Sequence, residues 1–280
     1  MTNKTKGILC ITLSALSFAL MAVFIKLSGD LPSVQKSLFR NVMGVIVVGS
    51  LIYKNKIDLR EVKHFKLLTL RSVLGTVGVI TNFYAVDHLY LADANIISRL
   101  STFFLLIFSF LFLNEKVSVK QIIAIVIAFI GAAFVIRPQF SAEIVPYIIA
   151  LTGALCAGGA YTVLRALGKK EHPLVVVFYF SSFSTLVLLP LVLTNFVTMT
   201  TSQIFALILA GVFATFGQFG VTFAYKFAPA SEISIYNFIG VIFSAILGFI
   251  LFNQSSDYMS YIGYITIFSA SLYMFKQKKA

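Results

Sequence analysis

Long apolar stretches alternate with short polar breaks along the whole chain. Each stretch is about 20 residues long, which is the length that an α-helix needs to cross a hydrocarbon core of ~30 Å. The pattern predicts ten membrane spans, at residues 7–28, 33–53, 67–86, 92–114, 119–137, 144–165, 174–194, 203–226, 230–252 and 258–275. The longest polar break, residues 54–66, is expected to lie on the membrane surface, and the others are too short to form separate domains.

The composition agrees with this pattern. Of the 280 residues, 59% are hydrophobic and only 11% are charged, whereas a soluble domain carries about 25% charged residues. The sequence therefore predicts an all-α, multi-pass integral membrane protein of the cell membrane, with the lipid bilayer as its surroundings.

The second half of the chain repeats the first half at an offset of 139 residues. The segment FLFLNEK (Phe110 to Lys116) corresponds to FILFNQS (Phe249 to Ser255), so that Asn114 corresponds to Asn253. The same offset pairs Thr76 with Thr215, Gly78 with Gly217, Ala85 with Ala224, Asp93 with Glu232 and Lys26 with Arg165. Because each copy holds five spans, an odd number, the second copy must be inverted in the bilayer. We expect two inverted five-helix repeats, 7–137 and 144–275, an arrangement that places binding sites at the repeat interface in transporters.

The basic residues indicate membrane topology. The net charge of +12 could suggest nucleic-acid binding, but the placement of the charges argues against it. If the N-terminus is cytoplasmic, 17 of the 22 lysines and arginines fall at cytoplasmic ends and loops, and the other five are Lys26, Lys36, Arg40, Arg99 and Arg137. The positive-inside rule therefore predicts that both termini are cytoplasmic. Arg71, at the start of the third span, is interpreted as part of this topology signal.

The sequence predicts no metal site, cofactor or disulfide. Cys10 and Cys156 fall inside separate spans, and the three histidines lack the spacing of metal ligands. The phosphate-binding pattern GxxxxGK[ST] is absent, so any transport is expected to proceed without ATP hydrolysis by this chain. No cleavable signal peptide is expected, because the first apolar run is too long for one.

Several short motifs are shared with a known family. In residues 71–116 these are the opening Arg71 to Gly75, the pair Tyr84-Ala85, the run LADANII (Leu91 to Ile97) and the acidic Glu115. Together with Phe39-Arg40, they resemble the EamA domain of the drug/metabolite transporter superfamily, and residues 146–275 repeat the pattern more weakly. The resemblance covers nearly the whole chain. It implies an alternating-access carrier of small metabolites, often an exporter of amino acids or related compounds.

The chain departs from this family in the middle of the fourth and ninth spans. Proline is common there, whereas this chain has Thr102 and Val241. Because a proline frees a carbonyl group and lets a helix bend, we expect these helices to be straighter, or to bend at glycine. Gly240 lies beside Val241.

Two arginines are the first candidates for substrate binding. Arg40 and Arg99 each lie about seven residues into a span that runs inward, hence roughly 10 Å below the outer hydrocarbon boundary. A charge there costs on the order of 2.5 kcal/mol, and the middle of the spans contains no Asp or Glu. Either both arginines line a central cavity and bind a carboxylate, or they snorkel to the headgroups. Lys26, near the outer end of the first span, is interpreted as an interface anchor.

The other candidate binding residues are polar or aromatic: Ser98, Asn82 and Tyr84 in the first copy, and Tyr161, Tyr179, Gln218, Tyr236 and Asn237 in the second. The repeat pairs Arg99 with Phe238 and Arg40 with Tyr179, so we expect one basic wall and one wall of aromatic and amide side chains. Such a lining suits a zwitterion with an apolar side chain. For Asn82, Tyr84 and Gln218, hydrogen bonding between helices is the alternative.

These features favour a secondary transporter that exports or exchanges a small metabolite, an amino acid or a related carboxylate-bearing compound. The lack of acids and histidines within the spans disfavours a carrier dedicated to cations and weakens a proton-coupled mechanism. The expected partners are a small-molecule substrate and the lipid bilayer, and a homo-oligomer is left open.

Three alternative functions are weighed against this one. The first is a broad-specificity drug exporter with an aromatic pocket. A membrane-embedded enzyme is disfavoured, because no paired Ser/His, metal cluster or acidic motif is found in the sequence. A non-transporting membrane sensor would not need a polar cavity between the repeats.

Overall fold

Helices make up all the regular secondary structure in the ranges that the computed structural model describes, residues 2–59, 62–113, 118–136, 144–167, 170–227 and 234–277. The first half contains α1 (Asn3–Leu27), α2 (Ser33–Lys54), α3 (Phe65–His88), α4 (Leu91–Arg99), α5 (Ser101–Leu113) and α6 (Val119–Ile136). The second contains α7 (Val145–Leu167), α8 (Pro173–Thr194), α9 (Thr201–Phe227), the 3₁₀ helix η3 (Ser234–Phe238), α11 (Ile239–Phe252) and α12 (Tyr258–Gln277). Of the residues named above, Asn114 to Lys116, Arg137 and Glu232 lie outside the described ranges.

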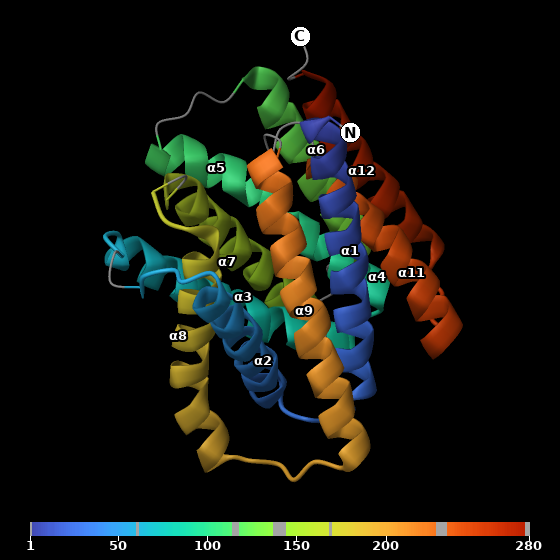
Figure 1. Cartoon of the computed structure of the whole chain (residues 1–280). Coiled ribbons are helices and arrows are strands. Elements are labelled where there is room, and N and C mark those ends of the chain that lie inside the picture. Colours follow the sequence, from blue (N-terminus) through green and yellow to red (C-terminus); the bar gives the residue numbers. More distant parts are fainter. Residues whose placement is uncertain are drawn as a thin grey trace.

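The helices have the length and composition of membrane spans. Eight are long and apolar enough to cross a membrane, when Leu91–Leu113 is taken as one helix. A shorter apolar helix, Tyr236–Phe252, and α12 lie at the ninth and tenth predicted spans. The prediction of an all-helical, mostly apolar fold is confirmed, while the number of spans stays a prediction. The start of α1 and the end of α12 lie at the same end of the bundle (Figure 1).

The outer surface of the bundle is apolar. Phe112, Leu186 and Leu193 have 72%, 71% and 70% of their surface exposed. Contiguous apolar surface of this kind is a liability in water, but it is the expected lining of a helix that faces lipid, because the backbone hydrogen bonds are satisfied within the helix.

The main helix contacts join the two halves of the chain. α1 packs along α9, α3 along α7, α2 along α8 and α6 along α12, and Figure 1 shows α1 beside α9. When each helix is exchanged for its counterpart in the sequence repeat, the α1–α9 pair becomes the α7–α3 pair. The same exchange leaves the α2–α8 and α6–α12 pairs unchanged. An approximate two-fold axis between two similar units produces this kind of pairing.

Individual residue contacts in the two halves are also related by the sequence repeat. A Cβ atom on Gly220 of α9 would lie 2.6 Å from Ser14 Cβ of α1. A Cβ atom on Gly153 of α7 would lie 2.6 Å from Thr81 Oγ1 of α3. The repeat offset relates Ser14 to Gly153 and Thr81 to Gly220, so the two contacts are equivalent. Both crossings depend on glycine, because small residues let helix backbones approach closely.

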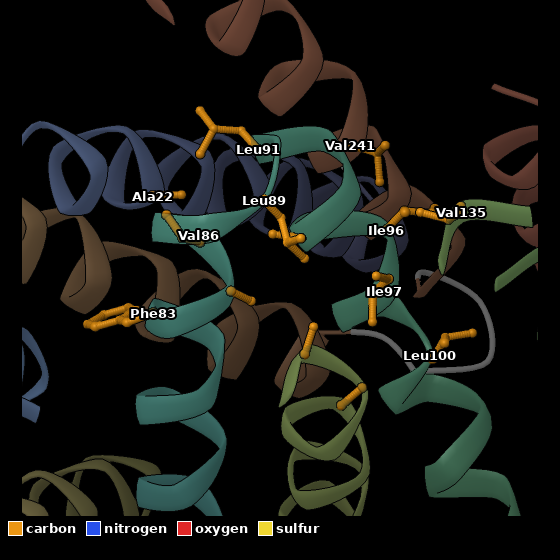
Figure 2. Packing of buried hydrophobic residues seen from close by; sticks show 14 of the residues in the cluster. Ala22, Phe83, Val86, Leu89, Leu91, Ile96, Ile97, Leu100, Val135 and Val241 are labelled. Atoms are coloured by element: carbon orange, nitrogen blue, oxygen red, sulfur yellow. The ribbon is translucent and has the colours of Figure 1, made fainter. Parts of the chain in front are cut away.

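The fourth predicted span is broken rather than straight. α4 ends at Arg99 and α5 begins at Ser101, and Leu100 between them is buried (Figure 2). The N–H of Leu100 donates to Ile97 O at 3.0 Å, and the N–H of Phe103 donates to Leu100 O at 2.9 Å. These three-residue hydrogen bonds tighten the turn, and the N–H of Phe104 also donates to Leu100 O at 3.0 Å, in the four-residue α-helical pattern.

The ninth predicted span changes its geometry at the equivalent place. The 3₁₀ helix η3 ends at Phe238, which corresponds to Arg99, and α11 begins at the next residue. For the fourth span the expectation of a straighter helix is wrong, because α4 and α5 are separate helices and the turn between them forms without a glycine. In the ninth span η3 continues directly into α11, two residues before Gly240, and the expectation for that span stays a prediction.

A single acidic residue links the α2–α3 and α7–α8 loops. Glu171 Oε1 accepts hydrogen bonds from the backbone N–H groups of Lys63 at 3.0 Å and His64 at 2.9 Å, and it lies 3.1 Å from His64 Nδ1. Partial burial alone would raise the pKa of the Glu171 carboxyl, but these hydrogen bonds hold that pKa below its usual value. The contact is therefore made by the ionised carboxylate.

Gly220→Ala should destabilise the protein, because the new methyl group would overlap α1 and overpacking costs roughly 1–3 kcal/mol. Gly78→Ala is the matched control, since its Cβ would lie 3.5 Å or more from its neighbours and alanine favours a helix by about 1 kcal/mol over glycine. In thermal unfolding of the purified protein, we expect a lower Tm for Gly220→Ala and an equal or higher Tm for Gly78→Ala. Equal Tm values for the two variants would contradict the close crossing.

Glu171→Gln should lower the Tm at neutral pH. A carboxyl with a depressed pKa stabilises the folded state above its unfolded pKa of ~4.3, and this contribution is lost as the pH falls through the folded pKa. The Tm difference between parent and variant should therefore shrink on acidification. Asp30→Asn, at an exposed position, serves as the control and should behave like the parent. A Tm difference that is constant with pH would argue against the carboxylate contact.

Candidate functional site

The break between α4 and α5 places Arg99 against the second half of the chain. Arg99 Nε and Nη2 donate to Asn95 Oδ1 at 3.0 and 2.9 Å, and Asn95 Nδ2 donates to Ser244 Oγ of α11 at 2.8 Å. A Cβ atom on Gly240 would lie 2.7 Å from Arg99 Nη2. The absence of a side chain at Gly240 therefore leaves room for the guanidinium, close to both helix breaks.

A second group of basic side chains lies between α2, α3 and α8. Arg40 and Arg71, here called the arginine pair, are only 5% and 7% exposed. Their guanidinium carbons lie over the ring of Phe180, 5.7 and 3.9 Å from its centroid. Arg40 Nη1 donates to Asn41 Oδ1 at 3.1 Å, whereas Arg40 Nε and Arg71 Nη1 are buried without a hydrogen-bond partner.

Two glycines make room for α8 at the arginine pair. A Cβ atom on Gly75 would lie 2.8 Å from Phe180 Cε2, and one on Gly44 would lie 2.6 Å from Ser181 Oγ. A small cavity adjoins this place, lined by Arg40, Asn41, Gly44, Val177, Phe180, Ser181, Ala214, Thr215 and Gln218. The packing thus leaves space beside a buried cation.

Arg71 belongs to this group although the sequence pattern does not indicate it. Its interpretation as a topology signal stays a prediction, and the structure shows in addition that the side chain is buried between helices. α3 begins at Phe65, so Arg71 lies more than one turn inside the helix, and its side chain stacks on α8. The sequence also gives no signal for Phe180, which is one of 29 phenylalanines.

The structure gathers some of the predicted site residues into two groups. Gln218 lines the cavity beside Arg40, and Tyr161 of α7 is 37% exposed. Ser98 and Asn237 lie at the two helix breaks, and Asn237 Oδ1 is buried without a hydrogen-bond partner. Gln218 thus lies beside the arginine pair, and Ser98 is the neighbour of Arg99 in the chain.

Other predicted site residues lie apart from these groups. The Tyr179 hydroxyl lies 2.8 Å from Thr69 Oγ1, and its ring packs edge-on against Phe65. Tyr84 stacks on His88 at the end of α3, with ring centroids 4.0 Å apart. Asn82 is half-buried on α3, and Tyr236 in η3 is 37% exposed.

Two lysines hold the far end of α3. Lys26 Nζ donates to Val86 O at 3.1 Å and to Leu89 O at 2.8 Å, and cations stabilise the carbonyl groups at the C-terminus of a helix. Lys36 is fully buried, and its Nζ lies 2.6 Å from Asp87 Oδ1. Both cations have partners within the protein, and the role of Lys26 as an anchor at the membrane interface stays a prediction.

The two apolar halves of the bundle pack through equivalent helix contacts, and cations lie buried between the helices. Transporters that are built from internal repeats have an architecture of this kind. The sequence agrees: the chain belongs to the EamA-like transporter family, which matches residues 5–137 and 144–276. The resemblance to this family is therefore confirmed.

Several known proteins are similar over most of their length. The pseudopaline exporter CntI of Pseudomonas aeruginosa is 30% identical over 276 residues, 98% of this chain and 97% of CntI. The riboflavin transporter of Brucella anthropi is 25% identical over 253 residues, 88% of this chain and 89% of that protein. One crystal structure, 14% identical, has a TM-score of 0.72 and covers 98% of this chain and 99% of its own, which shows the fold alone. The protein is thus a multi-pass membrane transporter of small metabolites and not an enzyme.

Phe180→Leu should destabilise the protein, because it removes the ring on which both arginines stack. Each cation–π contact is worth about 0.5–2 kcal/mol, and the smaller side chain also leaves a cavity. Phe178→Leu is the control, since Phe178 lies on the same helix and packs near Gly49 of α2. Thermal unfolding should give a clearly lower Tm for Phe180→Leu than for Phe178→Leu, and the reverse order would contradict the stacking.

Proposed function

We propose that this protein is a secondary transporter that exports or exchanges a small zwitterionic metabolite, an amino acid or a related carboxylate-bearing compound, by alternating access. In this proposal ten spans form two inverted five-helix repeats, 7–137 and 144–275, with both termini in the cytoplasm. The symmetric exchange of helix contacts between the halves supports the repeats, and the distribution of basic residues supports the orientation.

The observation that carries the proposal is a change of helix geometry at equivalent positions of the repeat: a turn follows Arg99, and a 3₁₀ helix passes into α-helix after Phe238. Broken helices at a repeat interface are used by transporters to present polar groups to a substrate. Here the first break presents a guanidinium, and the second presents the unpaired carbonyl oxygen of Asn237. A carboxylate would bind at Arg99 and an ammonium group would donate to Asn237, which together fit a zwitterion.

The remaining candidate residues would line the path in open states. They are Arg40, Ser98, Asn82, Tyr84, Tyr161, Tyr179, Gln218 and Tyr236. Export is the direction that the similarity to an exporter, CntI, supports. The glycine crossings between α1 and α9 and between α3 and α7 would allow the helices to slide against each other.

Ligand-dependent thermal stability of the purified protein tests the substrate class. The screen covers amino acids, organic acids and cationic compounds. A ligand at 100 times its Kd should stabilise the folded state by about 2.7 kcal/mol. We expect stabilisation by a carboxylate-bearing compound and its loss in Arg99→Ala. Arg165→Gln removes one exposed positive charge and should keep the parent response.

Transport of the stabilising compound into or out of proteoliposomes then tests the activity. Uptake that requires the same compound on the other side would indicate exchange, and uptake without it would indicate facilitated movement. Stabilisation only by apolar cations would instead favour the drug-exporter alternative. An unchanged response and unchanged transport in Arg99→Ala would show that Arg99 does not bind substrate.

A further inference from the structure

We infer that Asn95 is a positioning residue for Arg99: its side-chain amide sets the orientation in which the guanidinium binds the carboxylate of the substrate. Because it concerns the same carboxylate, this inference rests on the proposed function. Asn95 is not among the candidate binding residues that the sequence pattern indicates, and Ser244 of α11 anchors it.

The hydrogen bonds to Asn95 fix the plane of the guanidinium. Arg99 Nε and Nη2 both donate to Asn95 Oδ1, at 3.0 and 2.9 Å. Nε and Nη2 form one edge of the guanidinium, so these two bonds hold that edge toward Asn95. Because the donors of arginine form a rigid, planar fork, the Nη1–Nη2 edge then has a set direction. This is the edge at which a carboxylate can bind end-on.

An amide suits this task better than an acid. A carboxylate at position 95 would accept the same two bonds but would neutralise Arg99, as Asp87 does for Lys36 at 2.6 Å. An uncharged amide orients the guanidinium and leaves its positive charge to attract an anion.

The sequence repeat associates the amide with the guanidinium. Asn95 corresponds to Ser234 in the second copy, and Arg99 corresponds to Phe238. The two side chains therefore occur together in one copy and are both replaced in the other, as expected if one serves the other.

Asn95 is itself held by the second half of the chain. Its Nδ2 donates to Ser244 Oγ at 2.8 Å, and Ser244 is only 1% exposed. Since Arg99 offers donors alone, the amide turns its oxygen to Arg99 and its NH₂ group to Ser244. The orientation of Arg99 is thus tied to α11 through two successive hydrogen bonds.

This anchor belongs to a row of contacts between α4 and α11, which run antiparallel. A Cβ atom on Gly248 would lie 3.6 Å from Leu91 Cβ, and one on Gly240 would lie 2.7 Å from Arg99 Nη2. The contacts repeat at one-turn intervals, with Leu91, Asn95 and Arg99 of α4 facing Gly248, Ser244 and Gly240 of α11. A shift of either helix by one turn would break the bond that anchors Asn95, so the orientation of Arg99 depends on this register.

Thermal unfolding of the full-length protein with defined probes tests the inference. The probes are the twenty standard L-amino acids and the monocarboxylates from acetate to butyrate, together with the primary amide of the compound that stabilises the parent most. Asn95→Asp keeps the acceptor for Arg99 but neutralises its charge. We therefore expect the apparent Kd of the carboxylate to rise by about 10- to 100-fold, and that of its amide to change little. Ser244→Ala removes only the anchor and should raise the apparent Kd of the carboxylate by about 3- to 10-fold.

Asn55→Asp is the matched control, because it makes the same substitution at an exposed position after α2 and should respond like the parent. Equal weakening of carboxylate and amide by Asn95→Asp would indicate a general loss of structure, and no weakening would show that Asn95 does not set Arg99. Either result would overturn the inference while the proposed function stands. A parent that none of the probes stabilises would remove the proposed function and this inference with it.

Unfolding without a probe provides an independent readout. With Arg99 present, the carboxylate introduced by Asn95→Asp gains a charge partner, so the Tm should stay close to that of the parent. In an Arg99→Met background the same substitution leaves a half-buried carboxylate without that partner and should lower the Tm clearly. Equal shifts in the two backgrounds would mean that the side chains do not interact, which would overturn the inference.

Discussion

Close backbone contact between the two halves is the constraint on which the fold depends. Lipid tails are as apolar as the side chains that face them, so burial from water contributes little to holding one helix against another. Glycines at the α1–α9 and α3–α7 crossings let the helix backbones approach each other closely, and van der Waals attraction between many atoms then holds the helices together. A methyl group at Gly153 or Gly220 would meet the opposite helix at 2.6 Å. These crossings in turn position the broken helices and the basic side chains between the halves.

The cations buried inside the bundle fall into two sets, which differ in how their charge is compensated by neighbouring groups. Lys26 and Lys36 are satisfied by the end of α3, through carbonyl oxygens and through Asp87. Arg40 and Arg71 share an aromatic ring and keep open donors. The two lysines are satisfied within the protein, whereas Arg40 Nε and Arg71 Nη1 keep N–H groups without an acceptor. The difference between the two sets is visible only in their contacts.

The apolar periodicity was enough to predict the helices, because a span must satisfy its own backbone hydrogen bonds. It did not predict the break at Leu100, since the three-residue hydrogen bonds there need neither proline nor glycine. No sequence pattern indicated the surroundings of Arg71, because its burial depends on α8 packing against α3. The grouping of Arg40 with Arg71 depends on α8 packing between α2 and α3, and no local pattern encodes that tertiary contact.

The hydrogen bond from Ser14 Oγ to Gly217 O, 2.6 Å long, has no counterpart in the other half. The repeat relates Ser14 to Gly153 and Gly217 to Gly78, and two glycines cannot form a side-chain bond. The α1–α9 crossing therefore holds one interaction that the α3–α7 crossing lacks, worth about 1 kcal/mol. If the two crossings separate in turn, as in the alternating access that we propose, this hydrogen bond would favour one resting state over the other by roughly fivefold. A single hydroxyl group would then set the side to which the empty protein returns.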